Sequence, residues 1–255
     1  MCFDHDSRPP IAPIAGGSLD AREIVLAGED GNRFSAYLAR AAEPTGVGMV
    51  VLPDVRGLHA YYRDLSLRMA EHGVDAIGID YFGRTAGTGD RGPGFDWAQH
   101  VPQTTYEGMR SDVTAAVEHL RTTTGASRIF TMGFCMGGRL AFLTDGFGLG
   151  LTGVIGFYGW PVGPSRNGTP APAEIADTFE APVLAIFGGA DEGIGSDAVA
   201  AFEHALGAAG VEHRVVTYPG APHSFFDRKH EEFAEVSAAA WDEVLAFTGV
   251  SAESV

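Results

Sequence analysis

The sequence predicts a single α/β domain in which a mostly parallel sheet has helices on both faces, and three observations predict it. Short apolar runs alternate with helical patterns along the chain, as they do where crossover helices connect parallel strands. The runs are apolar at nearly every position, as in Gly48–Leu52, which is typical of strands buried on both faces. Glycine accounts for 35 of the 255 residues and often ends such a run, where the chain must turn.

The expected elements follow one another along most of the chain. An irregular arm covers residues 1–20, and one domain follows over residues 21–250. A hairpin opens the domain, because Gly28–Asn32 is rich in turn-forming residues. Residues 83–103 and 159–180 are expected to be long loops that form a lid or a pocket wall. The expected strands are residues 23–27, 33–39, 48–52, 74–79, 128–132, 152–157, 182–187 and 213–218. The expected helices are residues 60–73, a helix that opens in a capping box of Thr104 and Glu107, a helix from about Met136, and residues 196–206 and 231–247.

The charge of the chain excludes some classes of partner. The formal net charge is −16, and Lys229 is the only lysine. Nucleic acids and anionic membrane surfaces are bound by clustered cations, so neither is an expected partner. The first residues lack the basic and apolar regions of a signal peptide, and no apolar run approaches the ~20 residues of a membrane span. Cys2 and Cys135 are the only cysteines, too few for a disulfide scaffold. We therefore expect a cytoplasmic protein.

A cysteine stands in the sequence pattern of a nucleophile elbow. Cys135 follows the expected strand 128–132, precedes a helix and has glycines two residues away on each side, Gly133 and Gly137. This pattern is typical of the α/β-hydrolase fold, although serine is the more common nucleophile. The sharp turn requires small neighbours and directs the first amides of the helix, here that of Met136, at the reacting centre. The alternative is a buried structural cysteine on a glycine-rich turn.

The order of the remaining candidates also suits this fold, in which an acid and then a histidine follow the nucleophile along the chain. Asp191 comes just after the expected strand 182–187 and is preferred to Glu192 because it is closer to the strand. His223 lies in a proline- and glycine-rich loop after the last expected strand. The alternatives are a helix-capping Asp191 and a merely solvated His223. The spacing of the other histidines suggests no metal cluster, and no cofactor is expected.

With these residues in place, the chain resembles the dienelactone hydrolase family, also called carboxymethylenebutenolidases. The likeness covers most of residues 20–250 and is strongest at residues 133–139, near Asp191 and at residues 222–225. It implies a single-domain, cofactor-free α/β hydrolase that cleaves lactones or activated esters through a Cys–His–Asp triad. It implies in turn that the partner is a small ester or lactone, with or without a carboxylate, and that the protein is a monomer or small homo-oligomer.

The resemblance also implies roles for residues outside the triad. Asp54 occupies the place of an acid, commonly Glu in the family, that contacts the resting thiol and helps to form the thiolate. The N–H of Val55 matches the second oxyanion donor beside that of Met136. Arg84 matches a family arginine that holds a substrate carboxylate, and Arg56 is the other arginine considered for that role. A second family arginine lies four residues beyond the histidine, where this chain has Asp227, followed by Arg228.

Tyr158 matches a pocket aromatic, and a packed aromatic at a strand end is its alternative. The activity expected from these residues is attack of a Cys135 thiolate on an ester or lactone carbonyl, with His223 activating water afterwards. Three other functions remain open at this stage: a binding protein that kept the fold without turnover, a redox-sensing thiol, and an enzyme of the same fold that acts on a different biosynthetic lactone.

Overall fold

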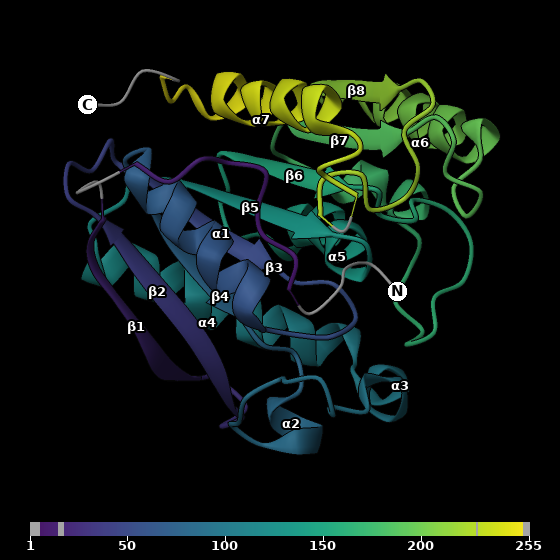
Figure 1. The fold of residues 1–255 in the computed structure, drawn as a ribbon. Coiled ribbons are helices and arrows are strands. Elements are labelled where there is room, and N and C mark those ends of the chain that lie inside the picture. The colour runs from purple at the N-terminus through teal and green to yellow at the C-terminus, as the bar shows by residue number, and fades with distance from the viewer. Residues whose placement is uncertain (1–5, 15–17, 228, 252–255) are drawn as a thin grey trace.

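The computed structural model describes residues 6–14, 18–227 and 229–251, and this part of the chain contains one eight-stranded sheet (Figure 1). Cys2 and Arg228 lie outside the described residues. The strand order is β1-β2-β4-β3-β5-β6-β7-β8; β2 runs antiparallel to both of its neighbours, and all other pairs are parallel. The strands are β1 Ser18–Ala27, β2 Arg33–Ala41, β3 Val47–Leu52, β4 Val74–Ile79, β5 Arg128–Phe134, β6 Gly153–Phe157, β7 Val183–Gly188 and β8 His213–Tyr218. The sheet confirms the predicted α/β class and the order of its strands along the chain.

Helices cover both faces of the sheet, with α1 and α7 on one face and α4, α5 and α6 on the other (Figure 1). The helices are α1 Ala60–Glu71, α2 Gly83–Ala86, α3 Trp97–His100, α4 Tyr106–Thr123, α5 Met136–Thr144, α6 Ser196–Ala209 and α7 Ala234–Thr248. Short 3-10 turns are formed by Val101–Gln103, Asp145–Phe147, Pro172–Glu174 and Ala176–Thr178. None of the helices in the described residues is both long and apolar enough to span a bilayer.

The central strand β3 shows why the apolar runs are continuous. Val47, Met49 and Val51 belong to the core cluster that contains residues of α1 and α7. Val50 and Leu52, which point to the opposite face, belong to the cluster that contains residues of α4 and α5. Side chains alternate between the faces of a strand, so a strand with helices on both sides must be apolar at every position.

Two expectations for the chain around α4 were wrong. The N-cap of α4 is Thr105, whose Oγ1 accepts the N–H of Gly108 at 3.0 Å, and not Thr104. Thr104 instead ends the preceding 3-10 turn, where its hydroxyl donates to the carbonyl of Val101 at 2.8 Å. The presumed loop 83–103 contains α2, α3 and that 3-10 turn, because short helices leave too few periodic positions to be recognised from the sequence.

Asp145, at the C-terminal end of α5, is a buried carboxylate whose titration affects stability. Its Oδ1 accepts the backbone N–H groups of Glu180 and Ala181 at 3.1 and 2.9 Å. Burial raises the pKa of Asp145 from its ordinary 3.8 to about 6, although the two amides act in the opposite direction. The folded state therefore holds an extra proton between these two pH values, and the free energy of unfolding falls as the pH rises through this range.

We expect Asp145→Asn to remove this pH dependence. An amide does not ionise and keeps an oxygen for the two backbone donors. Between pH 5 and pH 7.5 the wild-type protein should lose about 1 kcal/mol more unfolding free energy than the variant, as measured by urea denaturation. Asp177→Asn is the matched control, since this carboxylate is exposed. An identical pH dependence in wild type and Asp145→Asn would contradict the assignment.

Candidate active site

The turn between β5 and α5 holds Cys135 in a conformation that side-chain-bearing residues rarely adopt. Cys135 is the N-cap of α5, with φ 56° and ψ −114°. Its N–H donates to the carbonyl of Phe157 at 3.0 Å, and its carbonyl accepts the N–H of Arg139 at 3.1 Å. A Cβ at Gly133 would overlap the carbonyl of Gly137, which explains the glycines of the motif. The positive φ is maintained by these contacts and by the packing around the turn, which is typical of a functional site.

Asp191 and His223 form a close pair at the carboxyl ends of neighbouring strands. Asp191 follows β7 and His223 follows β8, and β7 and β8 are parallel. His223 Nδ1 lies 2.6 Å from Asp191 Oδ2, and a carboxylate at this distance accepts the Nδ1–H. The other carboxylate oxygen, Oδ1, accepts the N–H of Gly193 at 2.9 Å. Both oxygens are thus engaged, which fixes the orientation and tautomer of the His223 ring.

Two aromatic rings position His223 further. The ring centroids of Trp160 and Tyr158 each lie 4.8 Å from that of His223. The indole N–H of Trp160 donates to the carbonyl of Gly193 at 2.9 Å, and the Tyr158 hydroxyl donates to Asp227 Oδ2 at 2.9 Å. Burial, followed by the charge of Asp227, raises the pKa of Tyr158 well above its ordinary value, so the phenol remains a donor. Tyr158 is therefore a fully buried support for the His223 ring.

Cys135 and His223 open on the same cavity, whose volume is about 380 Å³. Val55 and Met136, the expected oxyanion donors, also line it. The segments 83–103 and 159–180 both contribute residues to the cavity wall, as the sequence indicated. The remaining lining residues are Trp97, Val101, Met109, Arg139, Leu140, Leu143, Trp160, Pro164, Ser165, Arg166, Asn167 and Thr169.

Asp54 is fully buried and does not line the cavity, and it directly follows Pro53, whose carbonyl packs against Gly137 in the turn that carries Cys135. Its Oδ1 accepts the N–H of Arg56 at 2.8 Å, and its own N–H donates to the Tyr62 hydroxyl at 3.0 Å. Burial raises the pKa of Tyr81 well above its ordinary value, and the nearby Asp54 and Cys135 add to this effect. Asp54 and Cys135 therefore both lie within electrostatic range of the Tyr81 hydroxyl. Arg56 is buried beside Asp54 and also does not line the cavity.

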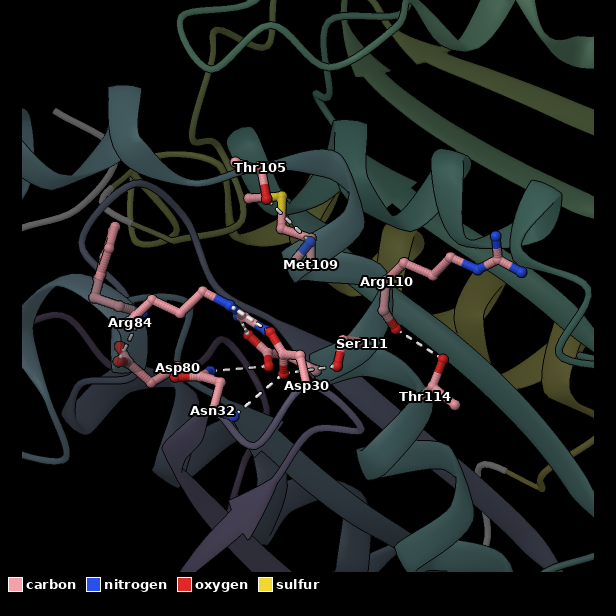
Figure 2. A network of polar contacts seen from close by, with 12 residues as sticks. Asp30, Asn32, Asp80, Arg84, Thr105, Met109, Arg110, Ser111 and Thr114 are labelled. Carbon is pink, nitrogen blue, oxygen red and sulfur yellow. Dashed lines mark hydrogen bonds and ion pairs between the residues drawn. The ribbon is translucent and has the colours of Figure 1, made fainter.

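Arg84 lies in a structural ion-pair network and not in the cavity (Figure 2). Its guanidinium donates to Asp30 Oδ2 at 2.6 and 3.1 Å and to Asp112 Oδ2 at 2.5 Å. Asp30 belongs to the turn between β1 and β2, and Asp112 belongs to α4. Arg84 therefore does not lie where it could hold a substrate carboxylate. Two carboxylates from distant segments already accept the hydrogen bonds of its guanidinium.

Arg139, Trp160 and Arg166 line the cavity and were not among the site residues expected from the sequence. Arg139 is buried and donates to backbone carbonyls of the segment from Trp160 to Pro170, so it ties this wall to α5. Trp160 contacts His223 from the same segment. Arg166 is exposed and lines the cavity, and no carboxylate of the described residues lies within ion-pair distance of it. The 133–139 motif contains Arg139 but does not indicate its contacts, and no local pattern marks Trp160 or Arg166, since all three roles depend on how an irregular segment folds back.

The family model described as the dienelactone hydrolase family matches residues 34–250. The chain belongs to this family. Dienelactone hydrolases are hydrolases of the α/β-hydrolase superfamily, so the chain is a hydrolase, and its sheet and helices have the corresponding fold. Within the described residues, no three histidine, cysteine, aspartate or glutamate side chains gather as a metal site.

Relatives and solved structures agree with this family. A protein of Salmonella typhimurium, named "Putative carboxymethylenebutenolidase", is 30% identical to the chain over 92% of this chain and 91% of its own length. A crystal structure from Klebsiella pneumoniae, named "Putative Dienelactone Hydrolase", has a TM-score of 0.73 and 28% identity, and covers 91% of this chain and 99% of that one. A dienelactone hydrolase-like phosphotriesterase from metagenomic libraries shares the fold with a TM-score of 0.75 at 21% identity, over 91% of this chain and 98% of that one.

Proposed function

We propose that this dienelactone hydrolase-family protein cleaves lactones or activated esters through a Cys135–His223–Asp191 triad and an acyl-enzyme intermediate. The observation that supports this most is that His223, which pairs with Asp191 at 2.6 Å, lines the same cavity as Cys135. A histidine with a fixed tautomer beside a nucleophile on a sharp turn is the arrangement required for covalent acyl transfer.

The first half of the reaction acylates the cysteine. His223 takes the Cys135 proton, and the sulfur attacks the carbonyl carbon of the ester to form an S–C bond. The backbone N–H groups of Val55 and Met136 donate to the oxyanion, a contact whose loss costs ~10²–10³ in rate in comparable sites. The alkoxide then leaves with the proton from His223, and a thioester remains. In the second half His223 deprotonates water, which attacks the thioester and releases the acid and the Cys135 thiolate.

Asp54 is the proposed thiol-activating acid. It is buried beside the nucleophile turn, and a carboxylate near a thiol is a second acceptor for its proton. Its side chain is one methylene shorter than the glutamate expected from the family resemblance, so we assign the larger share of thiolate formation to His223. A thiol nucleophile also needs a reducing compartment, which agrees with a cytoplasmic location.

Thiol chemistry limits the substrates. A thiolate leaves more readily than an amine or an unactivated alkoxide, so the tetrahedral intermediate of an amide collapses back to reactants. Enol lactones and reactive esters release a better leaving group, and they are the proposed substrate class. The proposed partner is thus a small molecule; either a monomer or a small homo-oligomer can perform this chemistry.

A pre-steady-state burst tests the proposed function. With p-nitrophenyl acetate in excess, one equivalent of p-nitrophenol should appear rapidly, and intact-protein mass spectrometry after acid quenching should show one added acetyl group. Peptide mapping should locate this group on Cys135. Release of p-nitrophenol without any acetylated protein, or acetylation elsewhere alone, would contradict a covalent mechanism at this cysteine.

A substrate carboxylate would meet Arg166 and not Arg84. Arg166 lines the cavity without an ion pair to any described carboxylate, in a protein whose net charge of −16 repels anions. We expect Arg166→Ala to lower kcat/KM for a carboxylate-bearing aryl ester about tenfold, mainly through KM, because a charged hydrogen bond is lost. The neutral analogue of the ester should be unaffected. Arg214→Ala is the control, since it removes the same charge from an exposed pair with Glu243. Equal losses for both esters would count against this role.

A further inference from the structure

One face of α5 extends the cavity well beyond the nucleophile. Met136, Arg139, Leu140 and Leu143 all line the cavity, and their spacing of three or four residues puts them along one helical face. An α-helix rises 1.5 Å per residue, so Leu143 lies about 10 Å from Met136 along the axis. The cavity therefore continues for about two helical turns past the residue that follows Cys135.

The far end of this cavity is apolar and buried. Val101, Met109, Leu140 and Leu143 line it, and each is no more than 4% exposed. Met109 comes from the first turns of α4, visible in Figure 2 beside Thr105, and Val101 comes from the 3-10 turn before that helix. We call these four residues the acyl channel. An apolar channel gains stability from apolar ligand surface that leaves water, and the polar side chains that border it, Arg139 and Asn167, already donate to protein groups.

The wall opposite α5 is tied in place at two points. Arg139 donates to the carbonyls of Gly163 and Pro170 at 2.9 and 2.8 Å. Asn167 donates to the Thr104 hydroxyl at 3.0 Å and contacts the sulfur of Met109 at 3.7 Å. These contacts connect the 163–170 segment to both α5 and the start of α4. If the 163–170 segment moved away, the donors of Arg139 and Asn167 would lose their partners, and this cost keeps the channel wall in place.

The size of the cavity exceeds what a small lactone fills. A water molecule accounts for ~30 Å³ of liquid, so a volume of about 380 Å³ corresponds to roughly a dozen water-sized groups. A five-membered lactone ring at Cys135 would leave the acyl channel without contacts, and apolar walls without partner atoms lose dispersion energy. A longer apolar substituent on the acyl side would fill it.

We propose that the acyl channel binds a linear apolar acyl chain that extends from the ester carbonyl toward Leu143. An extended polypeptide advances about 3.3–3.6 Å for every three backbone bonds. An extended acyl chain has similar bond lengths, so about eight of its single bonds fit within 10 Å. The substrate class is therefore a medium-chain acyl ester, or a lactone with an alkyl substituent of this length. The inference rests on the proposed function, because the chain is counted from the carbonyl that Cys135 attacks.

A series of p-nitrophenyl esters with one leaving group and increasing acyl length tests the channel. We expect kcat/KM to rise about fourfold per methylene from acetate to octanoate, as burial of each methylene predicts, and to level off or fall at dodecanoate. Leu143→Phe should block the far end and lower kcat/KM for octanoate at least tenfold, with the acetate value within twofold of wild type. Leu67→Phe, at a partly buried α1 position away from the cavity, is the matched control and should change neither value.

Met109→Phe provides a second block from another helix if Leu143→Phe does not fold, and the same selective loss of octanoate hydrolysis is expected. A flat or falling profile from acetate to octanoate in the wild type would overturn the channel, as would equal losses for acetate and octanoate in a folded blocking variant. The proposed function is tested separately by the Cys135→Ala variant. A flat profile with hydrolysis that depends on Cys135 overturns the channel alone, whereas acetate hydrolysis that survives in Cys135→Ala overturns the function on which the channel rests.

Discussion

Cys135→Ala is expected to lower kcat/KM for p-nitrophenyl acetate by at least ~10⁴-fold, because the attacking atom is lost and no other group can form the thioester. The oxyanion donors of Val55 and Met136 remain, so a low residual rate above that of water is expected. Alanine keeps the Cβ at this positive-φ turn, where Cys135 is 3% exposed, and therefore leaves the fold intact.

The matched control is Cys2→Ala, which removes the only other thiol of the chain. This variant should retain full activity and the burst of p-nitrophenol. Circular dichroism and a thermal melt on both variants separate loss of chemistry from loss of fold. If Cys135→Ala hydrolyses the ester within tenfold of the wild-type rate, another nucleophile or a directly activated water must perform the reaction, and the proposed mechanism fails.

Asp191→Asn has the second largest expected effect, a fall in kcat of ~10³–10⁴, by analogy with serine-protease triads. Asp191 accepts the Nδ1–H of His223 at 2.6 Å and the N–H of Gly193 at 2.9 Å. In the variant the amide oxygen can retain the Gly193 contact, whereas the NH₂ group then faces Nδ1. The ring must present an acceptor at Nδ1 and move its proton to Nε2, where it can no longer take a proton from the thiol or from water.

The neighbouring carboxylate provides the control for Asp191→Asn. Glu192→Gln removes the same charge one residue further along the chain, at an exposed position, and should leave kcat within twofold. If kcat fell equally in both variants, the effect of Asp191→Asn would come from the loss of one negative charge and not from the hydrogen bond to His223.

The sharp turn at Cys135 was predictable because it is a local feature. A strand, a glycine, a cysteine and a further glycine within ten residues leave few backbone alternatives, and the structure shows φ 56° at Cys135 and no space for a Cβ at Gly133. Asp191 and His223 follow neighbouring parallel strands, so their meeting follows from strand order and chain polarity. The approach of Asp191 to His223 thus depends only on β7 and β8 being parallel neighbours.

The roles of the arginines were not predictable in the same way. A position in a motif identified Arg84, but Asp30 and Asp112, which come from other parts of the chain, occupy its guanidinium. Arg139 ends the 133–139 motif and Arg166 belongs to no motif, and in both cases the irregular segment 159–170 determines that one is buried against carbonyls and the other faces the cavity. Which group pairs with a long charged side chain depends on how elements that are far apart in sequence pack against each other.

The sequence by itself determined the α/β class, the succession of the strands along the chain and the positions of Cys135, Asp191 and His223 after three of them, because apolar periodicity and turn residues act over short stretches of chain. Only the tertiary structure decided what surrounds them: Trp160 and Tyr158 against the His223 ring, the burial of Asp54, and the apolar cavity wall along α5. The physical reason is that a cavity is the space left between segments that are distant in sequence, so its shape depends on how those segments pack and not on any one of them.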